Sequence, residues 1–175
     1  MRRLLLLRHA KSSWNRPDLD DAERPLNARG QRAAPLMGRY ISGHGLLPDM
    51  VLCSTAVRAR QTLELVTAEW ETADGEEIKV VMRSSLYLAS VAELLAIVRR
   101  TDDDVESIML IGHNPGLATF AGLASGRGDS ASLRAMAMKF PTAALAVIDF
   151  DADRWNTVAH GDGLLRSFTR PKDLR

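Results

Sequence analysis

The chain has 175 residues, of which 46% are hydrophobic and 26% are charged; this is the composition of a folded globular protein and excludes a largely disordered chain. Its formal net charge is +1, so no overall electrostatic field would recruit nucleic acid or an anionic membrane, and neither is expected as a partner. The length predicts a single domain over residues 1–175.

The single cysteine, Cys53, cannot form a disulfide within the chain, which favours a reducing compartment such as the cytoplasm. The apolar run behind the basic start MRR is shorter than a signal peptide requires. No stretch approaches the ~20 apolar residues of a membrane-spanning helix. We therefore expect a cytoplasmic protein.

Short apolar runs alternate with helical patterns along the chain. The first run, RLLLL, is too short for a helix and is typical of a buried strand. Strands are predicted in chain order at 3–7, 49–54, 77–82, 107–112 and 143–150. Helices are predicted between them at 28–45, 56–70 and 90–100 and from Pro115 onward.

Two of these helices carry local signals. Pro35 leaves the start of the helix at 28–45 open, and Ser90 with Glu93 has the pattern of a capping box. The C-terminal stretch RSFTRPKDLR (166–175) is expected to be a solvated basic tail. The alternation as a whole predicts an α/β fold, a three-layer α/β/α sandwich around a mainly parallel sheet.

Three predicted strand ends carry cationic or ionisable side chains. Arg8 and His9 follow the first strand, Arg58 lies in the first turn of the helix after the second, and His113 follows the fourth. Because the carboxyl ends of parallel strands meet at one edge of a sheet, we expect these four residues to converge. Two arginines and two histidines would repel one another unless an anion joined them. Phosphate fits best, because guanidinium groups bind its oxygens in pairs and helix N-termini add donors.

The neighbouring positive charge should lower the pKa of His9 below the reference value of about 6.5 and keep its imidazole neutral. A neutral imidazole is a nucleophile, and the cationic pocket would stabilise a phosphoryl group during transfer. The cluster therefore predicts phosphoryl transfer through a covalent phosphohistidine. No metal or other cofactor is expected, because His9 and His113 have no further ligand at metal-binding spacing and the arginines repel cations.

Four motifs occur in an order that resembles the histidine phosphatase superfamily, which has the phosphoglycerate mutase-like fold. They are LRHAKSSWN (7–15), RPLNARGQRAA (24–34), STAVRARQT (54–62) and GHNP (112–115). The resemblance implies that His9 is the catalytic nucleophile and that Arg8, Arg58 and His113 complete the catalytic phosphate pocket.

The resemblance implies that three further residues of the motifs contact the phosphate. Ser12 and Asn15 fall on polar positions of the first motif. Arg24 matches an arginine of the short SixA-like phosphohistidine phosphatases, which this chain resembles also in its length.

One departure from the family pattern bears on the substrate. Larger members supply a carboxylate acid between the motifs that correspond to STAVRARQT and GHNP, where this chain reads VVMRSSLYLAS (80–90), and Glu93 comes later, within a predicted helix. A missing acid favours a labile phosphate such as phosphohistidine over a stable ester. An acid from the first loop remains an alternative, and the candidates are Asp18, Asp20, Asp21 and Glu23. The short distance between the two motifs leaves no room for a large cap, so an open pocket is expected.

The sequence thus predicts a metal-independent hydrolase, a phosphatase that acts on phosphohistidine in a protein. Two alternatives stay open. One is a phosphatase for small phosphomonoesters, and the other is a non-catalytic module that binds a phosphorylated ligand. Mutase activity is disfavoured, because a mutase needs a closed pocket that keeps water from the intermediate.

Overall fold

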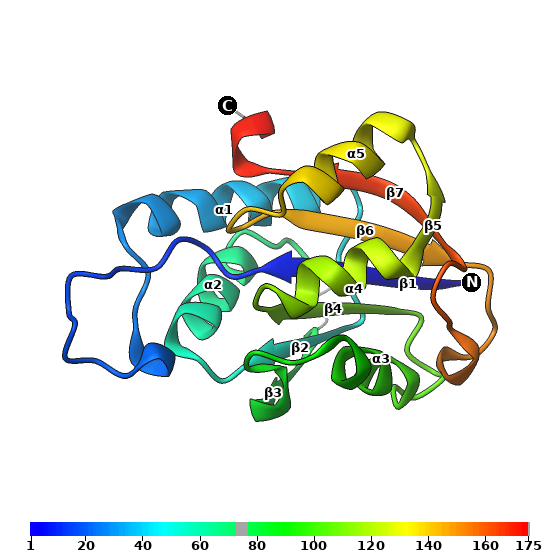
Figure 1. Cartoon of the computed structure of the whole chain (residues 1–175), viewed down its shortest axis with the longest axis horizontal. Helices are drawn as coiled ribbons and strands as arrows, with labels where there is room; N and C mark the ends of the chain where they lie inside the picture. Colours follow the sequence, from blue (N-terminus) through cyan, green and yellow to red (C-terminus); the bar gives the residue numbers. More distant parts are fainter. Residues whose placement is uncertain (73–76, 175) are drawn as a thin grey trace.

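The computed structural model describes residues 1–72 and 77–174, and its centre is a seven-stranded sheet (Figure 1). The strands, in the order in which they lie side by side, are β3 (Lys79–Arg83), β2 (Met50–Ser54), β4 (Ser107–Gly112), β1 (Arg2–Arg8), β6 (Leu145–Phe150), β7 (Gly163–Thr169) and β5 (Ser125–Gly128). Four pairings are parallel, and β6 runs antiparallel to both of its neighbours. The predicted mainly parallel sheet is confirmed.

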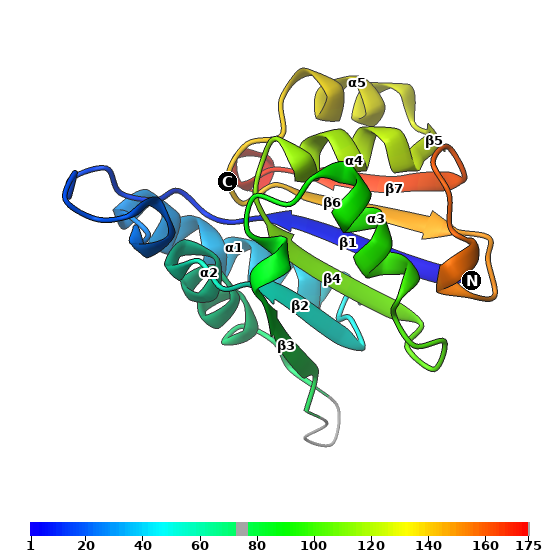
Figure 2. The same cartoon turned by 60° about the horizontal axis from the view of Figure 1, so that its bottom comes forward.

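Helices cover both faces of the sheet and complete the three predicted layers (Figures 1 and 2). α1 (Ala28–Gly43) and α2 (Val57–Thr67) pack on one face, and α3 (Val91–Arg99), α4 (Gly116–Ala124) and α5 (Ser130–Met138) pack on the other. The capping box predicted for Ser90 and Glu93 is present at the start of α3. Among the helices described, none has both the length and the apolar character needed to cross a membrane.

The four leucines of β1 are fully buried because this strand lies inside the sheet and is covered on both faces. Leu4 and Leu6 belong to the core under α3, α4 and α5, whereas Leu5 and Leu7 belong to the core under α1 and α2. Successive side chains of a strand point to opposite faces, so a strand covered on both sides reads as a continuous apolar run. Burial of each leucine contributes roughly 1.5–3 kcal/mol.

α1 begins at Ala28, and Pro35 lies inside it rather than at its start. Asn27 caps the helix by accepting a hydrogen bond from the Gly30 backbone N–H (3.0 Å). A Cβ at Gly30 would lie 2.2 Å from the carbonyl oxygen of Lys11, so only glycine lets the helix approach the chain behind β1 this closely. The start of α1 is thereby packed against the segment that follows His9.

In the part of the chain that the structure describes, two strands and one α-helix were not predicted from the sequence, β5, β7 and α5, and the prediction of a solvated C-terminal tail is wrong. Arg166–Thr169 belong to β7, which pairs with β6. The strand tolerates Arg166 because its guanidinium pairs with Asp149 at 2.8 Å, while Thr169 is buried. Pro171–Leu174 then form a 3₁₀ turn beside α1. Tertiary pairing decided this segment, since its own sequence is polar and lacks a strand-like alternation.

Candidate active site

The carboxyl ends of three neighbouring parallel strands bring the four residues of the predicted cluster together. Arg8 ends β1, His113 directly follows β4, and Arg58 lies in the first turn of α2 behind β2. The ring centroids of His9 and His113 are 5.1 Å apart, and Arg58 Nε lies 3.3 Å from His9 Nε2. The side chains of His9, Arg58 and His113 are buried. The open pocket expected from the short sequence between the motifs stays a prediction.

His9 is held in one tautomer. Its Nδ1 lies 2.7 Å from the carbonyl oxygen of Ala10, which can only accept, so Nδ1 carries the proton and Nε2 keeps its lone pair. The pKa of His9 is lowered to about 3, mainly by burial. The neighbouring His113 and the positive charges of Arg58 and Arg8 contribute to this lowering, and the hydrogen bond to the Ala10 carbonyl opposes it. The predicted direction is confirmed, although burial rather than charge is the main cause. His9 is therefore neutral at neutral pH.

The backbone of His9 and Ala10 is fixed by hydrogen bonds to two other elements, β4 and α2. The His9 N–H donates to the Gly112 carbonyl at 3.1 Å, and the Ala10 N–H donates to Thr62 Oγ1 at 2.9 Å. Thr62 in turn donates to the Arg58 carbonyl (2.6 Å). These bonds tie the candidate nucleophile to the end of β4 and to the helix that carries Arg58. Thr62, the last residue of the STAVRARQT motif, thus stabilises the local backbone around His9.

His113 is anchored by Ser54, the last residue of β2. Its Nε2 lies 2.7 Å from Ser54 Oγ, while His113 Nδ1 is buried and has no hydrogen-bond partner in the described chain. Burial lowers the pKa of His113 to about 4, with a further contribution from the positive charge of Arg58. The second histidine is therefore also neutral at neutral pH, and one of its ring nitrogens remains available to a ligand.

Arg8 is oriented by the backbone in front of β6. Its Nη1 donates to the Phe140 carbonyl at 2.9 Å, and Asn114 Nδ2 donates to the same oxygen at 2.9 Å. Its Nε is buried and has no partner among the residues described. Burial and the nearby Arg58 lower the pKa of Arg8. The Phe140 carbonyl thus positions Arg8 through Nη1, and the buried Nε–H group remains available to donate a hydrogen bond to an anion.

Asp21 is the acid of the first loop that reaches the cluster. Its Oδ2 accepts from Tyr87 Oη (2.5 Å) and from Arg58 Nη2 (2.9 Å), and its Oδ1 accepts from Arg24 Nε (3.0 Å). The Tyr87 hydroxyl contributes most to lowering the pKa of Asp21 to about 2, and the two arginines add to this effect. Asp21 is therefore ionised at neutral pH, and its carboxylate binds Nη2 of the Arg58 guanidinium.

The three further residues carried over from the motifs lie in different surroundings. Arg24 is buried, joins the cluster through Asp21, and stacks its guanidinium 3.4 Å from the centre of the Trp14 ring. Ser12 forms an isolated bridge with Leu26, and Asn15 is exposed. The structure thus brings Arg24 to the edge of the cluster, whereas the phosphate contacts of Ser12 and Asn15 stay predictions.

Sequence reasoning gave no role to Tyr87, which contacts two members of the cluster. Its ring lies edge-on to His113 with centroids 5.3 Å apart, and the Arg58 guanidinium carbon lies 5.8 Å from its centroid. A Cβ at Gly116 would lie 1.8 Å from the Ala89 carbonyl oxygen, so the start of α4 packs directly on the segment that carries Tyr87. The signal for Tyr87 in the sequence is that it is the one aromatic side chain of the stretch VVMRSSLYLAS.

The chemistry of the cluster suits an anion. Within residues 1–72 and 77–174, no three His, Cys, Asp or Glu side chains gather in a way that could hold a metal ion. Arg8, Arg58 and Arg24 bring positive charge to the site, and guanidinium groups match the geometry of phosphate oxygens.

Comparison with known proteins agrees with this geometry. The family model of the histidine phosphatase superfamily (branch 1) matches residues 4–83. An uncharacterised protein of Mycobacterium tuberculosis is 36% identical over 169 residues, which cover 95% of this chain and all of that protein. A crystal structure from Agrobacterium tumefaciens, assigned as the phosphohistidine phosphatase SixA, is 30% identical with a TM-score of 0.78 and coverage of 97% of this chain and 98% of that one.

The chain belongs to the histidine phosphatase superfamily. A Nakamurella multipartitia structure, also assigned as SixA, has a TM-score of 0.82 at 28% identity and covers 97% of this chain and 96% of its own. The phosphoglycerate mutase-like fold implied by the motifs is confirmed by these structures. This histidine phosphatase is accordingly a hydrolase of phosphoryl groups.

The stability of this histidine phosphatase should fall as the pH drops from 7 to 5. In the unfolded chain His9 and His113 take up protons near pH 6.5, whereas in the folded protein their pKa values are about 3 and about 4. Between these limits the unfolded chain binds more protons, so the free energy of unfolding decreases as the pH decreases. Urea unfolding at pH 7 and pH 5 measures the difference.

A His9→Asn, His113→Asn variant provides the control for this pH effect and should show a much smaller difference between the two pH values. Asp21 does not disturb the comparison, because its stabilising effect is lost only below its unfolded pKa of about 3.8. Equal pH dependence of unfolding in the two proteins would contradict the assignment to the two histidines.

Replacing Asp21 by asparagine should tighten the binding of inorganic phosphate, by about threefold to tenfold, since an incoming anion would no longer compete with a carboxylate for Arg58. Inhibition constants for phosphate measure this. Asp20→Asn is the matched control, as it removes the same charge from the adjacent residue. If Asp21 instead donates a proton to the leaving group, the turnover number would fall and phosphate inhibition would be unchanged.

Proposed function

We propose that this histidine phosphatase hydrolyses phosphohistidine in a protein, with His9 as the nucleophile. The observation that carries the proposal is the state of Asp21. This carboxylate contacts the cluster, yet Tyr87, Arg58 and Arg24 hold it ionised with a pKa of about 2, so it is not poised to donate a proton. An alkoxide leaving group depends on such a proton, whereas the imidazole of a phosphohistidine departs more readily.

Substrate binding begins with an exchange of anions at Arg58. Phosphoryl oxygens replace the Asp21 carboxylate on the Arg58 guanidinium, and Arg8 supplies further donors, including its buried Nε. Charge-assisted hydrogen bonds of this kind are strong in a buried site and match the trigonal phosphoryl group during transfer. The pocket thus holds the phosphorus next to His9.

Ser54 sets the tautomer of His113 in this scheme. Its Oγ accepts from the Ala56 backbone N–H at 3.3 Å and directs its own proton to His113 Nε2. His113 Nδ1 then carries a proton and donates it as a hydrogen bond to a phosphoryl oxygen. Ser54 acts through His113 and is a positioning residue.

The chemical step uses the lone pair of His9 Nε2. This nitrogen attacks phosphorus, the P–N bond of the substrate breaks, and its electron pair returns to the leaving imidazole, which takes a proton from water. In the second half of the reaction a water molecule attacks the phosphorus of the phosphorylated His9 and loses a proton. The bond to Nε2 breaks, and inorganic phosphate and neutral His9 are released.

The names given to similar proteins support this choice of substrate. The Agrobacterium tumefaciens and Nakamurella multipartitia proteins are both assigned as phosphohistidine phosphatases and align over nearly their whole lengths with this chain. We propose the cytoplasm as the compartment, because Cys53 has no second cysteine in the sequence with which to form a disulfide.

A comparison of substrates tests the proposal. The values of kcat/KM are measured for a protein phosphorylated on histidine, for free phosphohistidine, and for a set of sugar, glycerate and serine phosphates. We expect the phosphorylated protein to be the best substrate, by about 100-fold or more over the esters. Efficient turnover of an ester with none of phosphohistidine would instead identify a small-molecule phosphatase, the second function that the sequence left open.

A further inference from the structure

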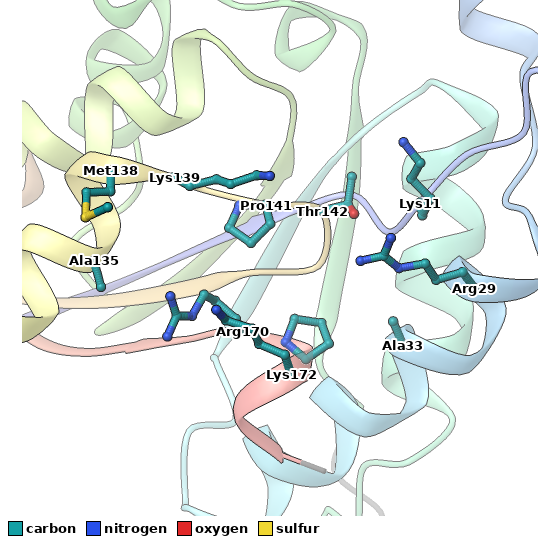
Figure 3. A pocket seen from close by; sticks show the side chains of 11 residues that line it. Lys11, Arg29, Ala33, Ala135, Met138, Lys139, Pro141, Thr142, Arg170 and Lys172 are labelled. Carbon is teal, nitrogen blue, oxygen red and sulfur yellow. The ribbon is translucent and has the colours of Figure 1, made fainter.

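A cavity of about 420 Å³ lies beside the active site, at the sheet edge where β7 ends and β6 begins (Figure 3). Five cationic side chains line it, and we call it the cationic cavity; they are Lys11, Arg29, Lys139, Arg170 and Lys172. Its walls come from the segment after β1, from α1, from the end of α5 and from the turn behind β7. It therefore joins segments that are far apart in the sequence.

The positive charge of the cationic cavity is largely uncompensated. No acidic side chain lines it among the residues described. Arg170 is paired with Asp173 at 2.9 Å, but within residues 1–72 and 77–174 the other four cations take part in no ion pair. Like charges around one cavity repel one another, and an anion bound between them removes this repulsion.

Two of these cations are brought together by the fold itself. The Lys11 carbonyl accepts from the Asn27 N–H at 2.9 Å, and the backbone of Lys11 packs directly on Gly30. Lys11 is thereby held next to the turn of α1 that carries Arg29. Figure 3 shows the guanidinium of Arg29 and the amino group of Lys139 pointing toward the middle of the cavity from opposite walls. Backbone packing thus sets the position of Lys11 next to Arg29.

The lining also has an apolar part. Ala33, Ala135, Pro141 and Pro171 contribute carbon surface, and Met138 is 86% exposed at the rim. Small-molecule sites typically have volumes of about 300–1,000 Å³, so the cavity has the size for an organic ligand, and a single phosphate ion would fill only a small part of it. Exposed methionine adapts readily to the shape of a bound ring.

We propose that the cationic cavity binds a small organic polyanion of nucleotide size, a molecule with an apolar or aromatic body and at least two negatively charged groups. The site is separate from the phosphoryl pocket. The Phe140 carbonyl faces Arg8, whereas the flanking residues Lys139 and Pro141 line the cavity. The proposal does not depend on the reaction that His9 performs.

Fluorescence titration with trinitrophenyl-ADP, a nucleotide with an aromatic group and two phosphates, tests the proposal on the full chain. We expect saturable binding that weakens about tenfold or more in the variant Arg29→Glu, Lys139→Glu. The matched control is Arg32→Glu, Arg134→Glu, which changes the net charge equally at exposed positions of α1 and α5 outside the cavity. This control should bind within about twofold of the unmodified protein.

The variant Arg58→Ala separates the cavity from the active site and should bind the probe as the unmodified protein does. Equal weakening in the two charge-reversed variants, weakening in Arg58→Ala alone, or no saturable binding would overturn the proposal. Circular dichroism checks the folding of each variant, and Arg29→Gln, Lys139→Gln repeats the comparison without charge reversal. Because binding is measured without turnover, failure here leaves the phosphatase reaction untouched, and an inactive enzyme can still bind the probe.

Discussion

Turnover should fall by about 10⁴-fold or more when His9 is replaced by alanine, because the variant lacks the nitrogen that forms the bond to phosphorus. His9 Nε2 carries the lone pair, since Nδ1 donates to Ala10 and burial holds the pKa of the ring at about 3. The unmodified protein should form a phosphoenzyme that is labile in acid and stable in base, and the variant should form none. Rapid quenching after mixing with labelled phosphohistidine protein measures both effects.

His44 offers a matched control for this substitution. It is an exposed histidine whose Nδ1 also lies near a backbone carbonyl, that of Tyr40, at 2.9 Å. His44→Ala should retain normal turnover and normal phosphoenzyme. Unimpaired turnover by His9→Ala would rule out His9 as the nucleophile, and loss of activity in both variants would point to a general effect on folding.

Arg58→Ala should lower kcat/KM by about 10²- to 10³-fold, the usual cost of removing a buried donor that stabilises charge in the transition state. Arg58 is only 2% exposed and touches both His9 Nε2 and the Asp21 carboxylate. Arg58→Lys should recover little of the loss, because an ammonium group cannot make the paired hydrogen bonds of a guanidinium. Steady-state kinetics with a phosphohistidine protein as the substrate gives kcat/KM for the unmodified protein and for the two variants.

Arg60 lies two residues further along α2, is exposed, and provides the control. Arg60→Ala should change kcat/KM by less than about twofold. The assignment of Arg58 to the phosphoryl pocket would be contradicted if both alanine variants behaved alike. It would also be contradicted if Arg58→Lys were as active as the unmodified protein.

The parts of the fold that the sequence predicted correctly are those with a local or strictly periodic cause. The continuous apolar run Leu4–Leu7 predicted a buried strand, and the structure places it inside the sheet. Ser90 and Glu93 predicted a helix start through a motif that needs only four residues. The parallel arrangement followed from the alternation of strands and helices, and it brought Arg8, His9, Arg58 and His113 to one edge.

The missed parts depend on pairing between distant segments. The polar sequence from Arg166 onward predicts a tail, but pairing with β6 and the ion pair of Arg166 with Asp149 hold its first residues in a strand. Tyr87 and Ser54 received no role, since nothing local in the sequence indicates which ring or hydroxyl will face a histidine from another strand. Asp21 was one of four candidate acids, and only its contacts separated it from the others.

The sequence by itself determined the family, the order of the elements and the chemical groups that meet at the strand ends, because motif, spacing and strand order are written along the chain. The tertiary structure alone decided how deeply those groups are buried and which partners they have. Burial is the main reason why His9 and His113 stay neutral, and long-range contacts keep Asp21 ionised on Arg58. Protonation at this site thus depends on desolvation and on contacts between segments far apart in the chain, and neither can be read from spacing.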